Sequence, residues 1–598
     1  MSELAASGAQ HGGVAARIVT VDDSQDPTKA LAELGLSGGR PVLVLCGGAA
    51  SLDDDPAIRM ALAPVLGPSV LMAAARTGAL VVDGGTNAGV VALLGQSASP
   101  EASAPLLGVA PAALVAPPGA HPENGRVALE PHHLYFVLTP GTEWGDETGW
   151  LARLSAAAAG DEQVAMVVAG GGAGTSAEIQ EAVKRRWPIV LLEGTGGLAD
   201  DLARRWRRAY TPPARREGIR FSYRGSLPPA AGPNLPGGGA ADELDQAVIV
   251  GSFRLTRAAR VSDLANALEW ELRRHPVLIS AWERFARYDA DAVRLRRSFE
   301  RSQLTILALG LTATLLALLL HALTTPLRGS GAWIATTMHW TVVSLPLLAA
   351  VLIAFADRFA LGKRWVLLRG AAESIKGEIF RYRTCTGVYG DETESPESRE
   401  QSLATRLAAV DTRLFGTEAS SADVPVYSGP LPPVESRVGG ADDGFRFLDA
   451  ANYLTLRVVD QIRFYRSRTR QYGRRLRIIQ AVILLAAAAA ALLAAAGQEI
   501  WIGLMTALAS AFAVHRSYLQ LDATVVAYNQ SASQLENLVS RWEALPVKDR
   551  EAEYSWFVDQ AEAVLQTELG AWIQQMNEAL QTLRRQHAGE DKEPRAGR

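Results

Sequence analysis

Cysteine is scarce in this chain, which has only two, Cys46 and Cys385, in 598 residues. Two thiols cannot form a disulfide framework or a cysteine-rich zinc module, and such low usage fits a reducing compartment. One dominant charge is also absent, because 59 basic and 63 acidic residues leave a net charge of −4. This balance excludes the strongly basic field of a nucleic-acid-binding protein. The N-terminal residues lack a basic stretch followed by an apolar one, so we expect no signal peptide.

Long apolar runs are missing before residue 300 and frequent after it. The mean hydropathy of +0.06 therefore averages an aqueous part and a part in lipid. A bilayer core about 30 Å thick needs about 20 helical residues. We expect four spans, at Leu304–Leu323, Trp333–Phe355, Ile478–Ala496 and Ile500–Val514. The third is rich in alanine and the fourth is short, so we expect this pair to insert together as a hairpin; a buried hairpin in a soluble protein is the alternative.

Arginines gather before the first span, after the second and before the third, whereas the two short turns carry only Arg328. The positive-inside rule then predicts a multi-pass protein of the inner (plasma) membrane with both termini in the cytoplasm. The lipid bilayer is the partner of these basic helices, because arginines at a membrane surface bind anionic headgroups. No nucleic acid is needed to explain them.

The two pairs of spans form a weak internal repeat, in which each pair lies between amphipathic helices. We expect the helices at Leu264–Ser302 and Phe445–Arg477 to run on into the first and third spans without a break other than Pro276 and the isolated Gly473. An apolar stripe near the C-terminus, which includes Trp572, Ile573 and Met576, predicts a seam between helices. The predicted division is a tail (1–14), an α/β domain (15–210), a linker (211–246), a first membrane unit (247–385), an insertion (386–442) with a helix near Gln401–Leu414, a second membrane unit (443–586) and a tail (587–598).

The first 210 residues repeat one local pattern: a short β-branched run, a glycine cluster and a helix. This pattern predicts a doubly wound, Rossmann-like α/β domain with a parallel sheet, in which ligands bind at the carboxyl ends of the strands. Glycine loops and helix N-termini favour phosphate groups, so we expect a nucleotide or a phosphorylated sugar. Tight packing of helix on strand is the alternative role for each glycine. The candidate ligand-binding residues in these loops are Gly47, Gly48, Gly84, Gly85, Thr86, Asn87, Gly171, Gly172, Gly174, Thr175, Gly194 and Gly196.

Other side chains near the predicted loops have two interpretations each. Trp144 could stack on a base and Glu147 could bind a ribose hydroxyl, or both could anchor a loop. His132 and His133 favour hydrogen-bonded packing over a metal site, and we expect neither a metal nor a cofactor. The acidic run Asp53–Asp55 could cap a helix. No Gly-Lys-Ser/Thr follows the glycines, which argues against a P-loop NTPase.

The segment GGGAGTSAEI resembles the PGG-x-GT-x-x-E signature of the SLOG superfamily, which includes the LOG enzymes, the DprA proteins and the cytoplasmic head of melastatin-type TRP channels. The segments DGGTNAGV, LEPHHLYFVL, EWGDETGWL and EGTGGLADDLA further resemble its prokaryotic TRP-channel-like branch, LSDAT. This similarity covers about residues 15–210. Both membrane units resemble SLATT domains, two-span effectors found with SLOG modules in prokaryotic conflict systems.

The resemblance implies a ligand-gated membrane effector for antiviral defence, in which the head senses a nucleotide derivative such as ADP-ribose and controls an ion channel or pore. Four spans are few for a pore, so we expect a homo-oligomer, by analogy with TRP channels a tetramer. The alternative is a membrane-tethered hydrolase of N-glycosidic bonds, as in the LOG enzymes, whose catalytic glutamate position is occupied by Glu178. Against it, Ala169 replaces the signature proline and no arginine lies within Asp161–Val168, with Arg153 the nearest. Glu178 would equally suit the helix dipole in the first turn of a helix.

Overall fold

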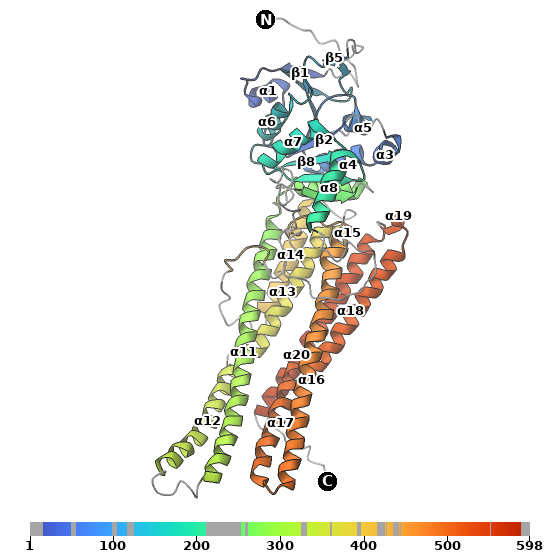
Figure 1. Ribbon diagram of the computed structural model, residues 1–598. Coiled ribbons are helices and arrows are strands. Elements are labelled where there is room, and N and C mark those ends of the chain that lie inside the picture. The colour runs from blue at the N-terminus through green and yellow to red at the C-terminus, as the bar shows by residue number, and fades with distance from the viewer. Residues whose placement is uncertain are drawn as a thin grey trace, which may run out of the picture. The chain divides into compact units, whose positions relative to one another are not determined.

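The computed structural model describes residues 16–48, 55–98, 104–116, 125–210, 253–257, 261–323, 332–358, 361–390, 396–415, 425, 427–433, 442, 444–550 and 552–587. The chain divides into two compact units (Figure 1). We call Met1–Pro276 with Arg437–Asp449 the head, and Val277–Ser436 with Ala450–Arg598 the helical unit. The linker predicted at 211–246 and the tail at 1–14 lie outside the described residues.

The head is built on one parallel sheet of eight strands, which confirms the predicted fold class. All seven strand pairs in the sheet are parallel, and their order is β1-β7-β4-β3-β2-β8-β9-β10. The strands are β1 (Arg17–Thr20), β2 (Val42–Gly47), β3 (Leu80–Asp83), β4 (Leu106–Pro111), β7 (Tyr135–Thr139), β8 (Val164–Ala169), β9 (Ile189–Glu193) and β10 (Phe253–Arg257), and a separate pair joins β5 (Val115–Ala116) to β6 (Val127–Ala128).

Helices cover both faces of this sheet, because alternate residues of each strand point to opposite sides. In β2, Val42, Val44 and Cys46 belong to one apolar core, and Leu43 and Leu45 belong to the other. The first core is closed by α1 (Pro27–Leu34), α6 (Thr148–Ala159), α7 (Ala173–Lys184) and α8 (Gly197–Tyr210). The second is closed by α3 (Pro56–Leu62), α4 (Leu66–Thr77), α5 (Gly89–Ser97) and α10 (Val261–Glu271).

Two segments that the sequence placed with the membrane units belong to the head instead. Strand β10 pairs with β9, and α10 packs against α4, so the head extends to Pro276 rather than to residue 210. The segment Arg437–Asp449, which covers the end of the predicted insertion and the start of the predicted second membrane unit, also belongs to the head. There the indole nitrogen of Trp270 donates to the backbone oxygen of Phe445 at 2.7 Å. Sequence reading missed both segments because each is short and separated from the sheet by a long insertion.

The helix expected over Leu264–Ser302 is interrupted in the structure at Pro276, the exception that the sequence marks. Helix α10 ends at Glu271, and α11 (Pro276–Leu323) begins at the proline. Proline has no N–H for the preceding turn and disfavours helical geometry in the residue before it, which explains the break. The second expected helix, over Phe445–Arg477, begins only at α15 (Ala450–Tyr453) and continues through a π-helical turn at Leu454–Val458 into α16 (Val459–Ala495).

The helical unit consists of long helices within the described residues. Besides α11, α15 and α16 these are α12 (Ala332–Arg358), α13 (Leu361–Thr384), α14 (Pro396–Phe415), α17 (Glu499–Leu519), α18 (Leu521–Ala544), α19 (Val547–Arg550) and α20 (Tyr554–His587). Helix α14 confirms the helix predicted near Gln401–Leu414. The predicted seam is also present, since Met576 packs with Trp365 and Phe299, and Trp572 and Ile573 lie against this cluster.

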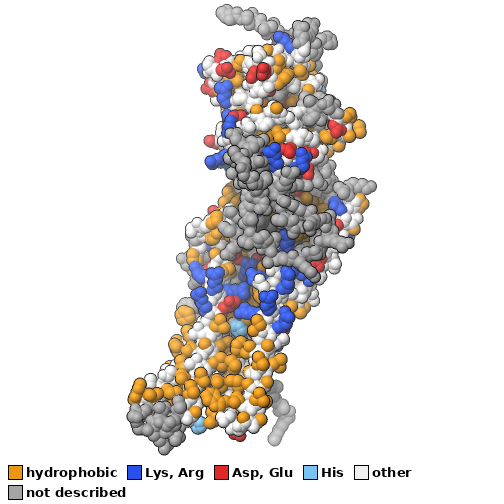
Figure 2. Space-filling view, viewed as in Figure 1, with side chains coloured by type: hydrophobic (Ala, Val, Ile, Leu, Met, Phe, Trp, Pro, Cys, Tyr) orange, Lys and Arg blue, Asp and Glu red, His pale blue; other side chains and the backbone are white. Residues whose placement is uncertain are grey.

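Four helical stretches in the described part of the chain are long and apolar enough to cross a membrane. Pro276–Ala322, Trp333–Ala356 and Ala450–Ala495 match the first three expected spans, and at most 11% of their apolar windows is buried. Their apolar surface is plain in Figure 2. The remaining stretch, Pro56–Thr77, lies on the sheet of the head with 44% of its window buried, as a core helix does.

The fourth expected span, Ile500–Val514, is not among these stretches. It lies in α17, where His515 and Arg516 end the apolar run early. The expected hairpin is nevertheless present, because α17 packs along α16 after a turn at Gly497, whose φ is 72°. Helix α17 is therefore a short apolar partner of α16.

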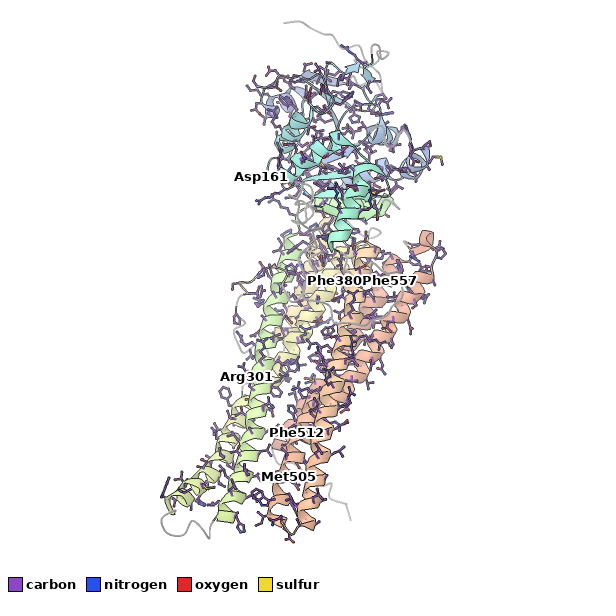
Figure 3. All side chains as sticks on the ribbon, viewed as in Figure 1. Asp161, Arg301, Phe380, Met505, Phe512 and Phe557 are labelled. Atoms are coloured by element: carbon purple, nitrogen blue, oxygen red, sulfur yellow. The ribbon has the colours of Figure 1, made fainter. Side chains whose placement is uncertain are left out.

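Charged side chains lie in the interior of the helical unit. Arg457 donates to both carboxylate oxygens of Glu562, at 2.8 and 2.9 Å, and Tyr453 donates to the same carboxylate at 3.0 Å. The Arg457 guanidinium also lies 4.5 Å from the ring centre of Phe380, which is labelled in Figure 3. This cluster ties the start of α16 to α20 and α13.

Candidate functional site

In the sheet of the head, the strand order reverses direction between β2 and β8, so a topological switch point lies there. From β2 the chain proceeds through β3, β4 and β7 in one direction, and from β8 through β9 and β10 in the other. In open α/β sheets, ligands bind outside the carboxyl ends of the strands at such a point. The loops there follow β2 at Gly47 and Gly48, β3 at Gly84, and β8 at Gly170. The strand order therefore places the predicted glycine loops together at the position where a ligand is expected.

Helix α7 presents unpaired backbone donors at this edge. Its N-cap is Gly172, and no side chain caps it. Within the described residues, the N–H groups of Ala173, Gly174 and Thr175 have no hydrogen-bond acceptor. Gly172 and Gly174 are exposed, and a Cβ built on either would meet nothing within 4 Å. Such a helix N-terminus carries partial positive charge and binds anions.

Three other predicted glycines are needed for packing. A Cβ at Gly47 would lie 2.4 Å from the Ala169 oxygen. At Gly85, whose φ is +65°, a Cβ would lie 2.8 Å from the Gly108 Cα. Gly171 has φ +98°, and its Cβ would lie 2.7 Å from the methyl carbon of the buried Thr175. Side chains at these positions would disturb the fold whether or not a ligand binds.

The loop after β9 uses its glycines differently from the prediction. The N–H groups of Gly194 and Gly196 donate to the Asp200 carboxylate, at 2.7 and 3.1 Å. The hydroxyl of Thr195 accepts the N–H of Gly170 at 2.8 Å, which ties this loop to the one after β8. A protein carboxylate thus occupies the donors that the sequence assigned to a ligand, so Gly194 and Gly196 support the neighbouring loop.

Glu178 of α7 lies beside groups from three other elements. The thiol of Cys46, in β2, hydrogen-bonds its carboxylate, and Glu147 and Asp83 are close enough to repel it. Burial is the main cause that raises the pKa of Glu178 to about 7, and the two neighbouring carboxylates add to it. Burial also raises the pKa of Glu147 and of the Cys46 thiol. Sequence reading named Glu147 and Glu178 but missed Cys46 and Asp83, although both end a strand directly before a glycine pair.

A chain of hydrogen bonds runs from Asp83 into the protein. The Nε2 atom of His133 lies 3.0 Å from an Asp83 oxygen, and its Nδ1 atom lies 2.8 Å from Glu130. Burial opposes the charged ring, but Asp83 and Glu130 raise the pKa of His133 to about 9. His132 Nδ1 contacts the other Glu130 oxygen at 2.7 Å. The two histidines therefore make hydrogen-bonded packing contacts, and His133 carries a positive charge that holds Asp83 in place.

The other residues predicted from the sequence differ in exposure and in hydrogen bonding; they are Trp144, Glu147, Asn87 and Thr86. Trp144 is 51% exposed, which excludes a core role and leaves stacking on a ligand open. Glu147 accepts the N–H of Gly145 at 2.8 Å, within the loop before α6. Asn87 is exposed, and its N–H donates to the Ala128 oxygen, while Thr86 pairs with Leu129.

Contacts in the structure show what Asp55 and Arg153, two further residues considered in the sequence analysis, do. The Asp55 carboxylate accepts the N–H groups of Ala57 and Ile58, so it caps α3 as predicted; Asp53 and Asp54 lie outside the described residues. The guanidinium of Arg153 lies 4.3 Å over the Trp150 ring and donates to the Asp23 backbone oxygen. It does not supply an arginine to the carboxylate group.

Comparison with protein families agrees with the architecture that the sequence suggested. Residues 40–218 match the model described as SLOG in TRPM, prokaryote. Residues 453–572 match the SMODS and SLOG-associating 2TM effector domain 1. Residues 283–397 match a protein family of unknown function, DUF4231, rather than a SLATT model. The head is therefore SLOG-like, and the chain is a membrane protein.

Among solved structures, the chain is similar to the X-ray structure of TM1055, a structural-genomics target. The identity is 24%, the match covers 27% of this chain and 81% of that chain, and the TM-score is 0.21. A search of the curated proteins found no match.

Proposed function

Because this chain joins a SLOG domain to a SLATT two-transmembrane effector domain, we propose that it is a ligand-gated membrane effector. The head binds a nucleotide-derived signal, and binding opens a path across the bilayer. The observation that carries the proposal is the uncapped N-terminus of α7, which lies at the switch point of the sheet and has open space at Gly172 and Gly174. In the host, such a pore would serve prokaryotic defence.

A ligand of the ADP-ribose type suits the groups around α7. Its phosphates would accept hydrogen bonds from the N–H groups of Ala173, Gly174 and Thr175. Its ribose hydroxyls would face Glu147 and Glu178, since a carboxyl group with a pKa near 7 both accepts and donates hydrogen bonds at neutral pH. The exposed Trp144 would stack on the base. Phosphate and carboxylates would bind different parts of the ligand, which avoids repulsion between them.

Three covalent connections support coupling between the head and the spans. The chain passes from one unit to the other after Pro276, after Ser436 and after Asp449. The first connection leads directly into α11, and the last leads through α15 into α16. Each of these helices carries an expected span. A ligand that orders the head therefore acts at the start of both, and about 5.5 kcal/mol of differential binding takes a 1:99 equilibrium to 99:1.

The number of spans in one chain affects how many copies are needed to line a path across the membrane. Within the described residues, only three stretches of the helical unit are long and apolar enough to cross a membrane. We therefore propose that several copies line the path, as a homo-oligomer, with the tetramer of TRP channels as the analogy. Both termini would lie in the cytoplasm, where a nucleotide signal is available.

Gly174→Asp tests the ligand site without disturbing the fold. Position 174 has open space and lies in the first turn of α7, where an acidic residue favours the helix. Its charge would repel the ligand phosphate, so calorimetry on the solubilised full chain should show ADP-ribose binding weakened about tenfold or more. The matched variant Gly174→Ala should bind as the wild type does. Gly85→Asp or Gly171→Asp would be a poorer test, because both positions have positive φ and no room.

A second experiment tests the pore. Full-length protein in dye-loaded liposomes should release dye when ADP-ribose is added, and the Gly174→Asp protein should not. Binding by calorimetry with tight liposomes would contradict the pore and leave a tethered sensor. Absence of binding would contradict ADP-ribose as the ligand.

The carboxylates at the site favour a second candidate function, hydrolysis of an N-glycosidic bond in a nucleotide. Glu178, with a pKa near 7 and Glu147 close by, has the properties of a general acid or base. Incubation with nucleoside monophosphates, followed by chromatography for the free base, tests this function. Release of base that Glu178→Gln abolishes would favour the enzyme, whereas no release by a protein that binds ligand would exclude it.

A further inference from the structure

Five arginines at one end of the spans have no acidic partner. They are Arg297 and Arg301 on α11 and Arg474, Arg475 and Arg477 on α16. All five are exposed, and within the described residues none forms an ion pair. Between Asp460 and Glu499, α16 carries no acidic residue at all. The described residues therefore do not neutralise this positive charge.

The two groups of arginines lie at the same level of the helical unit. Arg296 of α11 hydrogen-bonds Tyr472 of α16, and its guanidinium lies 5.6 Å from the ring centre of Trp365 on α13. This contact fixes α11 and α16 in register just beside the five arginines. Figure 2 shows Lys and Arg side chains gathered in a band next to the apolar surface, and Figure 3 labels Arg301 on α11.

The arginines adjoin the apolar runs. The expected spans begin at Leu304 and Ile478, three residues and one residue after Arg301 and Arg477 respectively. A guanidinium at that distance from the hydrocarbon reaches the depth of lipid phosphates, because arginine side chains extend toward the interface. Guanidinium groups bind phosphate through paired hydrogen bonds. The surface thus combines unneutralised charge, correct depth and the right chemistry.

We propose that these five arginines, the arginine collar, bind the headgroups of anionic phospholipids and prefer them to zwitterionic ones. Phosphatidylglycerol fits, because its headgroup keeps a net negative charge, whereas the choline of phosphatidylcholine neutralises the phosphate. The collar joins the first helix of each membrane segment to the same lipid layer. This inference does not depend on the ligand of the head or on which side of the membrane the head occupies.

The test uses the full chain in detergent and fluorescently labelled phosphatidylglycerol, with fluorescence anisotropy as the readout. The triple variant Arg474→Gln, Arg475→Gln and Arg477→Gln should bind this lipid at least about tenfold more weakly, since each basic residue near a lipid surface changes affinity about fivefold. The matched control Arg126→Gln, Arg186→Gln and Arg413→Gln removes the same charge from other exposed sites and should bind like the wild type. Replacing the three collar residues with Lys should retain most of the binding.

Further arms identify the source of the phosphate. Labelled phosphatidylcholine should bind weakly to every variant, and inorganic phosphate at millimolar concentration should not displace phosphatidylglycerol. Raised salt should weaken binding, because the collar is exposed and its charge is screened. Equal affinity for the two lipids, an unaffected collar variant, or an equal loss in the control variant would overturn the proposal. Displacement by inorganic phosphate would also overturn it, by assigning a site for free anions.

Discussion

The head and the helical unit treat buried charge in opposite ways. In the head, the strands are apolar on both faces; the buried charges Asp83, Glu130 and His133 lie at the carboxyl edge, and Glu269 is buried on the covering helix α10. In the helical unit, buried charges lie between helices: Arg457 on Glu562, and Arg383, which is fully buried. A parallel sheet covered on both sides leaves polar groups only where strands end, whereas helices can hold them anywhere along their length.

This difference has a consequence for what each unit requires. Asp83, Glu130 and His133 lie at the edge of the sheet where we propose that a ligand binds, so changes there leave the apolar cores in place. Those of the helical unit join residues about a hundred positions apart, such as Arg457 and Glu562, and they hold helices in register. Breaking a pair there should therefore affect stability more than a change at the edge of the sheet.

The largest expected effect is that of Glu562→Gln. The side chains of Arg457 and Glu562 are only 4% and 1% exposed, so the variant leaves a buried guanidinium without its counter-charge. Loss of one partner of such a pair costs about 3–5 kcal/mol. The apparent melting temperature of the protein in detergent should fall clearly.

An exposed pair of the same kind supplies the control. Arg466 contacts both oxygens of Glu536 at 2.7 and 3.0 Å, but these side chains are 34% and 36% exposed. Glu536→Gln should cost no more than about 1 kcal/mol, because water compensates the freed arginine. Equal losses in the two variants would refute the idea that burial decides the effect.

The next effect concerns pH and the head. The pKa of His133 rises from 6.5 unfolded to about 9 folded, so its stabilising contribution is complete below pH 6.5 and disappears as pH rises to 9. A shift of this size corresponds to about 3 kcal/mol. The melting temperature of the head transition should therefore fall between pH 6.5 and 9.

Two variants distinguish the titration of His133 from that of other groups. His133→Gln should flatten the pH dependence over that range, whatever its own stability. His132→Gln should keep it, because His132 bonds the other oxygen of Glu130 and is partly exposed. A wild-type melting temperature that stays level from pH 6.5 to 9 would show that His133 is not charged in the folded protein.

Among the three main variants, Glu562→Gln, His133→Gln and Trp270→Phe, the smallest effect is expected for Trp270→Phe. This change removes the hydrogen bond to the Phe445 oxygen while keeping an aromatic ring near Phe447, at the edge of the head core. Loss of one such bond costs about 1–2 kcal/mol. Hydrogen exchange of the amides from Gly444 to Leu448 should become faster. The exposed Trp144→Phe should leave that exchange unchanged, and faster exchange there would contradict a local effect.

Much of the fold could be predicted from the sequence because its signals are local. An apolar run followed by a glycine cluster marks β2, β3, β8 and β9, and an apolar run of about 20 residues marks a span. Strand β10 and the segment at Phe445 could not be found this way. Their signals are short, and their partners in the head are distant in the sequence.

The candidate site could likewise be predicted only in part from the sequence. Glu178 and the glycines after β8 could be named from one motif. The roles of those glycines could not, because packing at Gly47 and Gly85 and the Asp200 carboxylate on Gly194 depend on neighbouring elements. The approach of Asp83 and Cys46 to Glu178 depends on strand order, which no single motif encodes.

The interrupted chain of the head sets an order of events during synthesis. Because Arg437–Asp449 belongs to the head, the head cannot be completed until the ribosome has passed residue 449. By then the apolar stretches at Pro276–Ala322 and Trp333–Ala356 have already emerged. A chain cut short after residue 210 would also lack β10 and α10, so it would expose one edge of the sheet and part of one core. Completion of the head is thus tied to translation of the first membrane segment.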